Sequence, residues 1–216
     1  MASTVTKGHI RARSEEKRAR IVDAAMRHFA EHGYQDAHIE KMAAELRIAK
    51  GSVFQHFGSK EGLFLAAYKR AVASFSAYLD APEEVHKQGF FATLRYWLIR
   101  TDRLLREDWV PYRVALLGNY GTDLRLRREI NRFLRVEDPY GTAAFVAWGT
   151  KRREVRDDVD PEMIVSILDW TMERFQDALL TEELDPGLFR RQGARTEVRI
   201  HEFLSILHSA IARRRR

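Results

Sequence analysis

Apolar residues recur at helical spacing along almost the whole chain, and this periodicity constrains the fold more than any other feature of the sequence. Ile39, Met42, Ala43 and Leu46, for example, follow the i, i+3, i+4, i+7 pattern of an amphipathic helix. We find no stretch that alternates polar and apolar residues convincingly as a half-buried strand does, and no internal repeat. The sequence therefore predicts an all-α fold.

The first 80 residues predict three short helices followed by a long one. Ser14 is placed to cap a first helix that ends at Gly33. Two further short helices, joined by a tight turn, are expected within residues 38–57. The break at Gly58 is followed by a long helix, which we expect to run from Gly62 to Leu79.

Asp80-Ala81-Pro82 interrupts the helical pattern and predicts a domain boundary, because proline cannot continue a helix and restricts the residue before it. We expect one domain over residues 14–80 and a larger helical domain over residues 81–216. In the larger domain Gly118 to Gly121 predicts a break. Asp160-Pro161 predicts the cap and first turn of one long helix, and Thr196 the cap of the last helix.

The net charge of +6 is concentrated at the two ends of the chain. Residues 1–60 hold 11 lysines and arginines against 7 acidic residues, and four arginines form the tail Arg213 to Arg216. The ends are therefore the candidates for contact with polyanions, although basic termini can also act only in solubility. The basic segment from Lys7 to Arg20 could lie along a DNA backbone or minor groove.

Several classes of protein are disfavoured by composition. The chain has no cysteine, which excludes a disulfide framework, a thiolate zinc site and a cysteine nucleophile. No run of about 18 apolar residues and no signal-peptide pattern is present, so we expect a cytoplasmic protein without a membrane partner. None of the motifs GxGxxG, GxSxG or HExxH, and no Walker lysine loop, occurs. We expect neither an enzyme with catalytic residues nor a cofactor.

Two short helices joined by a turn form a helix-turn-helix, whose second helix enters the DNA major groove. If Ala49, Val53 and Phe57 face the core, the outward side of the second helix carries Gly51, Phe54 and Gln55, with Lys50 and Ser52 on its flanks. Glutamine can pair with adenine, lysine with guanine or phosphate, and glycine allows a close approach. His56 and Lys60 are placed for phosphates. Short helices of this kind also occur in proteins that never touch DNA.

The stretch from Arg18 to Phe64, above all the block Lys50-Gly51-Ser52-Val53-Phe54-Gln55-His56-Phe57, resembles the N-terminal domain of TetR-type regulators. The resemblance implies a three-helix DNA-binding domain that reads operator DNA and a helical domain that binds an effector and forms a homodimer. Departures occur at Ala37 and His38, where the family usually has hydroxyl residues, and at Arg47, where a glycine is usual. Arg47 could strain the turn or supply a cation near the backbone, and His38 could take over a lost phosphate contact.

The larger domain is rich in aromatic residues that suit an apolar cavity for a hydrophobic or aromatic ligand, or equally an ordinary core. The candidates are Trp97, Trp109, Tyr112, Leu116, Tyr120, Phe145, Trp148 and Phe175. Arg100, Arg103 and Arg106 could bind the acidic head of an acyl ligand or form a solvated face.

The two C-terminal helices carry apolar stripes that could form an isologous interface between two copies of the chain, or could be covered within the subunit. The residues of these stripes are Met163, Ile167, Trp170, Ile200, Phe203, Leu204 and Leu207. His28 and His32, four residues apart, could hold a metal but better fit a solvated helix face, so we expect no metal site.

The function we expect is a ligand-responsive regulator that represses transcription until a ligand releases it from operator DNA, with activation left open. The alternative is a helical dimer of the same fold that binds a ligand or protein without reading DNA.

Overall fold

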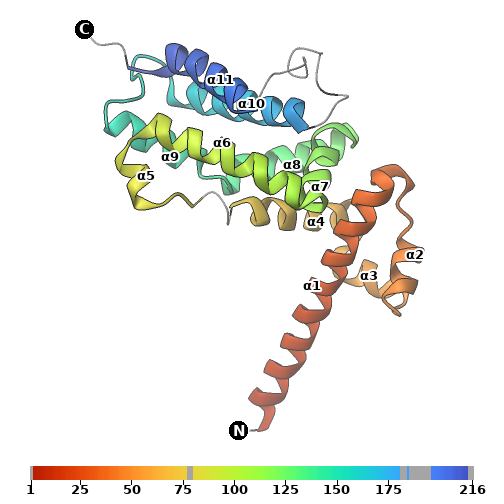
Figure 1. Cartoon of the computed structure of the whole chain (residues 1–216). Helices are drawn as coiled ribbons and strands as arrows, with labels where there is room; N and C mark the ends of the chain where they lie inside the picture. The colour runs from red at the N-terminus through yellow and green to blue at the C-terminus, as the bar shows by residue number, and fades with distance from the viewer. Residues whose placement is uncertain (1, 77–79, 181–183, 185–195, 214–216) are drawn as a thin grey trace. The chain divides into compact units, whose positions relative to one another are not determined.

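The computed structural model describes residues 2–76, 80–180, 184 and 196–213, which form eleven α-helices and confirm the predicted all-α class (Figure 1). These are α1 (Ala2–Asp36), α2 (Ile39–Glu45), α3 (Lys50–Phe57), α4 (Lys60–Ser76), α5 (Glu83–Lys87), α6 (Phe90–Glu107), α7 (Trp109–Tyr120), α8 (Leu124–Glu137), α9 (Thr142–Lys151), α10 (Pro161–Leu180) and α11 (Thr196–Ile211). Leu79 and the tail from Arg214 lie outside the described residues, as do the side chains of Lys7 and Arg106. Among the helices described, none combines the length and apolar character needed to cross a membrane.

The chain forms two compact units. Unit 1 comprises residues 1–74 and 109–136, and unit 2 comprises residues 75–108 and 137–216. The helices α7 and α8 therefore pack with α1 to α4, although they follow Asp80 to Pro82 in the chain. This grouping by packing differs from the boundary expected at the proline, which stays a prediction about functional domains.

Most helix boundaries agree with the sequence. Gly33, with φ of 76°, breaks the helical backbone of α1 at the position where an end was predicted. The start of α1 differs: the helix begins at Ala2, so Ser14 lies inside it and is not its cap. The break predicted over Gly118 to Gly121 begins only at Gly121, because α7 continues to Tyr120 and Gly118 is helical. A Cβ at Gly118 would lie 2.5 Å from Cε2 of Tyr68 in α4, so this glycine permits close packing rather than a break.

Unit 1 is built around an aromatic cluster that joins α1 to α4. The ring of Phe64 lies edge-on to Phe29 at 5.0 Å and to Tyr34 at 5.1 Å between centroids. Tyr68, one turn further along α4, packs edge-on against Phe133 of α8 at 6.2 Å. All but a few per cent of the surface of these residues is buried, so the cluster supplies much of the apolar burial that holds unit 1 together.

Unit 2 has a separate core around α6. Its members come from α6, α9, α10, α11 and the loop after α9: Phe90, Leu94, Leu98, Phe145, Val146, Val155, Ile164, Leu168, Phe175, Ile200, Leu204, Leu207 and Ile211. Phe90 and Phe145 stack at 4.2 Å between centroids. As predicted, α10 begins at Pro161, and Oδ1 of Asp160 accepts a hydrogen bond of 2.9 Å from the backbone N–H of Glu162.

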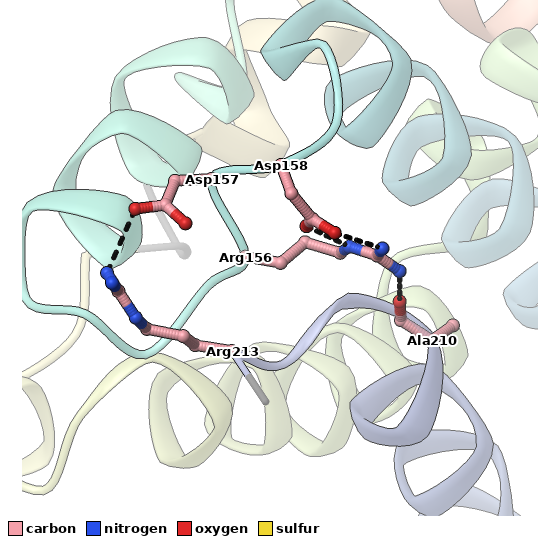
Figure 2. A network of polar contacts seen from close by, with 5 residues as sticks. All are labelled: Arg156, Asp157, Asp158, Ala210 and Arg213. Atoms are coloured by element: carbon pink, nitrogen blue, oxygen red, sulfur yellow. Dashed lines mark hydrogen bonds and ion pairs between the residues drawn. The ribbon is translucent and has the colours of Figure 1, made fainter. Parts of the chain in front are cut away.

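The end of α11 is tied to the loop between α9 and α10 by a polar network (Figure 2). Arg156 forms a two-pronged ion pair with Asp158, at 2.7 and 2.8 Å, and also donates to the carbonyl of Ala210 at 3.0 Å. Arg213 donates to Oδ2 of Asp157 at 3.0 Å. An isolated antiparallel bridge between Val155 and Ala212 lies beside these contacts. The first arginine of the basic tail therefore has an intramolecular partner.

We predict that Gly149→Ala destabilises the protein even though alanine is the better helix former. A Cβ at Gly149 in α9 would lie 2.4 Å from Cδ2 of Phe90 and 2.7 Å from Cγ2 of Val155. Forcing a methyl group into this packed core is expected to cost about 1–3 kcal/mol, more than the roughly 1 kcal/mol that helix propensity returns. Urea unfolding measures the difference.

The matched control is Gly51→Ala in α3, where an added Cβ would meet nothing within 4 Å. That variant is expected to gain about 0.5–1 kcal/mol from helix propensity alone. Equal effects of the two substitutions would contradict the assignment of Gly149 to a close contact.

Candidate nucleic-acid interface

The predicted helix-turn-helix is present in unit 1 as α2, a four-residue turn and α3. The backbone N–H of Arg47 donates to the carbonyl of Ala44 at 2.9 Å, and that of Ile48 to Ala43 at 3.0 Å. Arg47 has φ of 55°, in the left-handed region that favours glycine. The expected strain in the turn is therefore present in the backbone.

Tertiary packing, rather than local capping, holds these two helices in place. Neither His38 before α2 nor Ala49 before α3 caps its helix with a side chain. Helices of 7 and 8 residues are too short to be stable alone. Met42 of α2 and Val53 of α3 are almost completely buried, so the pair depends on its contacts with the rest of unit 1.

The outer side of α3 presents Gly51 and Gln55, both exposed and four residues apart. Ser52, Phe54 and His56 are half-buried. Ala49, which was assumed to face the core, is exposed, while Val53 is buried and Phe57 is half-buried. Lys50 and Gln55 are therefore the exposed polar side chains of α3.

Two cations from α1 contact α3, and the sequence did not indicate this pairing. The ammonium of Lys17 donates to Oγ of Ser52 at 2.8 Å, and the guanidinium of Arg18 lies 5.1 Å from the ring centroid of Phe57. Both belong to the basic segment that was expected near DNA. Because 35 residues separate Lys17 from Ser52, only tertiary structure could pair them.

Lys50 and Lys60 also have intramolecular partners. Lys50 forms an ion pair with Glu40 of α2, and this hydrogen bond holds the pKa of the Glu40 carboxyl below its ordinary value. The ammonium of Lys50 also lies 5.6 Å from the ring centroid of Phe54. Lys60 donates to the carbonyl of Gln35 at 2.9 Å and lies 5.2 Å from the ring centroid of Tyr34. His38 and Arg47 are also exposed.

His28 lies behind the start of α2 and is buried, which corrects the interpretation of His28 and His32 as a solvated face. Its Nε2 accepts a hydrogen bond of 3.2 Å from the backbone N–H of His38. His32 is exposed, with its ring 4.5 Å from that of His28. Burial, and then the charge of His32, lower the pKa of His28 below 6.5, while Glu45 and Glu31 oppose this.

The eight candidate ligand residues divide between the two units. Trp109, Tyr112, Leu116 and Tyr120 lie on α7 in unit 1, and Trp97, Phe145, Trp148 and Phe175 lie in unit 2. The ring centroid of Phe145 lies 4.3 Å from that of Trp97 and 5.5 Å from that of Trp148, so these three residues form one aromatic cluster. Phe175 packs elsewhere, stacked on Phe203 at 4.2 Å. The indole Nε1 of Trp97 is buried and has no acceptor among the described residues.

The candidate dimer residues differ in exposure. Ile200, Leu204 and Leu207 of α11 belong to the core of unit 2, so their assignment to an interface is corrected: they are covered by their own chain. Ile167 and Phe203 are half-buried against that core. Met163 and Trp170 of α10 are exposed by 49% and 65%. Val198 and Ile206, exposed by 48% and 72%, are the apolar residues that α11 presents to solvent.

Residues 21–67, which include α2, α3 and the parts of α1 and α4 that pack on them, match the family described as bacterial regulatory proteins of the tetR family. The chain contains the N-terminal DNA-binding domain of the TetR family. It is therefore a DNA-binding transcription regulator and not an enzyme.

Relatives of this chain match most of its length. The transcriptional repressor AcnR of Corynebacterium efficiens is 29% identical over 79% of this chain and 86% of its own. The transcriptional repressor Rv1474c of Mycobacterium tuberculosis is 27% identical over 78% of this chain and 83% of its own. The structure of the regulator FadR from Bacillus subtilis in complex with stearoyl-CoA covers 89% of this chain and 98% of its own, with a TM-score of 0.66 and 20% identity. That structural likeness concerns the fold.

We predict that Arg47→Gly stabilises this protein. A residue other than glycine in the left-handed region carries roughly 1–2 kcal/mol of strain, part of which is offset by the larger entropy of glycine in the unfolded chain. A net gain of about 0.5–1 kcal/mol in the free energy of unfolding is expected. Arg47→Ala serves as the control, because it removes the side chain and keeps the strain. A gain in both variants, or in neither, would be inconsistent with backbone strain.

We predict that the protein loses stability as the pH falls below 6.5, the ordinary pKa of histidine, and that His28 carries part of this loss. Because the pKa of His28 is lowered in the folded state, the unfolded chain takes up its proton first. Stability present above pH 6.5 is therefore lost between that value and the lowered pKa. Thermal denaturation of His28→Gln, whose amide oxygen offers an acceptor that does not titrate, should show a smaller fall of Tm with pH. Identical slopes in both proteins would contradict this role.

Proposed function

We propose that this regulator binds operator DNA as a homodimer, represses transcription by occupying the promoter, and is released by a small-molecule effector. The observation that carries the proposal is the exposed Gly51 and Gln55 side of α3, together with three lysines around this helix. Lys17 contacts Ser52, Lys50 begins α3, and Lys60 follows its end by three residues. A neutral hydrogen-bonding strip flanked by positive charge fits a major groove between two phosphate backbones.

Base recognition is assigned to the residues of α3. Gln55 offers a donor and an acceptor that match the N6 and N7 atoms of adenine. Gly51 has open space at its Cα, which would allow the backbone of α3 to approach the DNA closely. Phe54, half-buried under Lys50, can pack its ring edge on a thymine methyl group, and Ser52 can pair with either kind of base.

Phosphate contacts are assigned to the side chains around α3. Lys50 and Lys60 are held by the partners described above, at Glu40 and at the carbonyl of Gln35. Both contacts are exposed, so phosphate oxygens can replace the ion pair of Lys50 and the hydrogen bond of Lys60 at little cost. Arg47, His38 and His56 complete the set, and Lys17 adds an ammonium group from α1.

The dimer interface is assigned to the exposed apolar residues of α10 and α11. Met163, Trp170, Val198 and Ile206 would leave a hydrophobic surface in water on an isolated subunit. An isologous interface buries the same patch of both subunits and can place two α3 helices about 34 to 36 Å apart, one turn of DNA.

The effector is assigned to the aromatic cluster of unit 2. Trp97, Phe145 and Trp148 suit a hydrophobic or aromatic ligand, and the buried Nε1 of Trp97 offers a hydrogen-bond donor to a ligand oxygen. The structure of Bacillus subtilis FadR contains stearoyl-CoA, which supports an organic ligand with a long apolar part in a protein of this fold. The effector would bind more tightly to one spacing of the two α3 helices of the dimer than to another. Binding would therefore favour that spacing and change the affinity of the dimer for DNA.

We predict that selection from a randomised duplex library at physiological salt enriches a palindrome whose half-sites are about one helical turn apart. Gln55→Ala is expected to cost about 1–3 kcal/mol on the selected site and to relax preference at one position of each half-site. Lys60→Ala should weaken binding to all duplexes and lower the salt dependence by about one counterion. Asn131→Ala, which removes an exposed amide side chain of α8, is the control and should change neither.

The dimer is tested by analytical ultracentrifugation and by the same duplex selection. Trp170→Glu, which places a charge on the exposed apolar face of α10, should yield monomers in analytical ultracentrifugation and lose the preference for two half-sites. If the folded, dimeric protein enriches no sequence, the proposal of sequence-specific DNA binding is contradicted. That result would favour a binding module that does not read DNA.

A further inference from the structure

We propose that the concave face between α5 and α6 is a binding site for a small organic anion that carries two negative charges and a compact apolar body. A cavity of about 280 Å³ opens there, and its walls include Val85 of α5 and Arg95, Tyr96, Ile99, Arg100 and Arg103 of α6. All of these residues belong to unit 2, and none belongs to the DNA-reading helices. The proposal therefore stands or falls independently of the proposed operator binding.

The charge of this cavity is one-sided. Three guanidinium groups line it, and the residues of its walls include no carboxylate. Arg95 and Arg103 form no ion pair with any residue in the part of the chain that the structure describes. A bound dianion would supply the oxygens that guanidinium groups bind in pairs.

The apolar part of the cavity predicts an apolar part of the ligand. Tyr96 and Ile99 are half-buried, and Ile99 packs against the core of unit 2. Val85 closes the cavity from α5, and Gln88 adds one neutral polar group to its wall. The volume is slightly below the range of about 300–1,000 Å³ for drug-sized ligands, so a single ring or a short chain is the size that fits.

Duplex DNA fits this face poorly, because acidic residues bound it at both ends. Glu83 and Glu84 begin α5, and Glu107 ends α6, followed by Asp108. All four are exposed. An extended polyanion that followed the arginines would meet these carboxylates, whereas a compact anion would meet only the guanidinium groups.

The experiment uses the full-length protein without DNA and two probes that differ in their acidic group. Isothermal titration is carried out with phenyl phosphate, an aromatic phosphate ester, and with phenylsuccinate, an aromatic dicarboxylate. Binding of either probe supports the site, and the stronger of the two identifies the acidic group it prefers. Inorganic phosphate should bind more weakly than phenyl phosphate, because it leaves Tyr96 and Ile99 in contact with water.

Two variants test the arginines. Arg95→Gln combined with Arg103→Gln is expected to weaken the preferred probe by roughly a hundredfold, about tenfold for each charge-assisted contact. The matched control is Arg128→Gln combined with Arg135→Gln, two exposed arginines of α8 in unit 1, and should bind as the wild type does. Lysine at both positions should restore part of the affinity, since it keeps the charge and loses the paired geometry.

A second readout locates the site. Phenylglyoxal modifies exposed guanidinium groups, and peptide mass spectrometry should show that the preferred probe slows modification of Arg95 and Arg103 but not of Arg128 or Arg135. The proposal is overturned if neither probe binds at about 10 mM, a very weak affinity. It is also overturned if the arginine variant binds as tightly as its control, or if the protected arginines lie elsewhere.

Discussion

The position of the helix-turn-helix formed by α2 and α3 depends on the contact between the rings of Phe29, Tyr34 and Phe64. It joins α1 to α4 at the level where α2 begins, and both α2 and α3 lack side-chain caps. Burial raises the pKa of the Tyr34 hydroxyl to about 12, with Glu61 and Asp123 adding to the effect, so the ring stays neutral within the cluster. Two helices too short to persist alone are thereby held at a defined place on a rigid support.

Three lysines near the helix-turn-helix are held by weak contacts that other partners can replace. Lys17 reaches Ser52, Lys50 reaches Glu40, and Lys60 reaches the carbonyl of Gln35. Lys17 contacts α3 from α1, and Lys50 belongs to the first turn of α3. The exposed ion pair of Lys50 with Glu40 contributes little stability, so little is lost when Lys50 exchanges it for a phosphate.

In unit 2 the helix α6 has two different sides. Phe90, Leu94 and Leu98 lie in the core, and the side that carries Arg95 and Arg103 lines the cavity beside α5. A ligand there would touch a helix whose other side meets α9, α10 and α11. Binding at this face and packing in the core therefore share one rigid element, which is the physical requirement for one to influence the other.

Local periodicity and the backbone preferences of single residues were enough to predict the type and order of most helices, the helix-turn-helix and the strained turn at Arg47. The contacts of each apolar or charged face, in contrast, depend on tertiary packing. Ile200, Leu204 and Leu207 are buried within unit 2, and His28 is buried in unit 1. The helix α7 packs in the same unit as the helix-turn-helix, and Lys17 contacts Ser52. Periodicity shows that a helix has a face to bury, but the partner of that face lies far away in the chain and leaves no local signal.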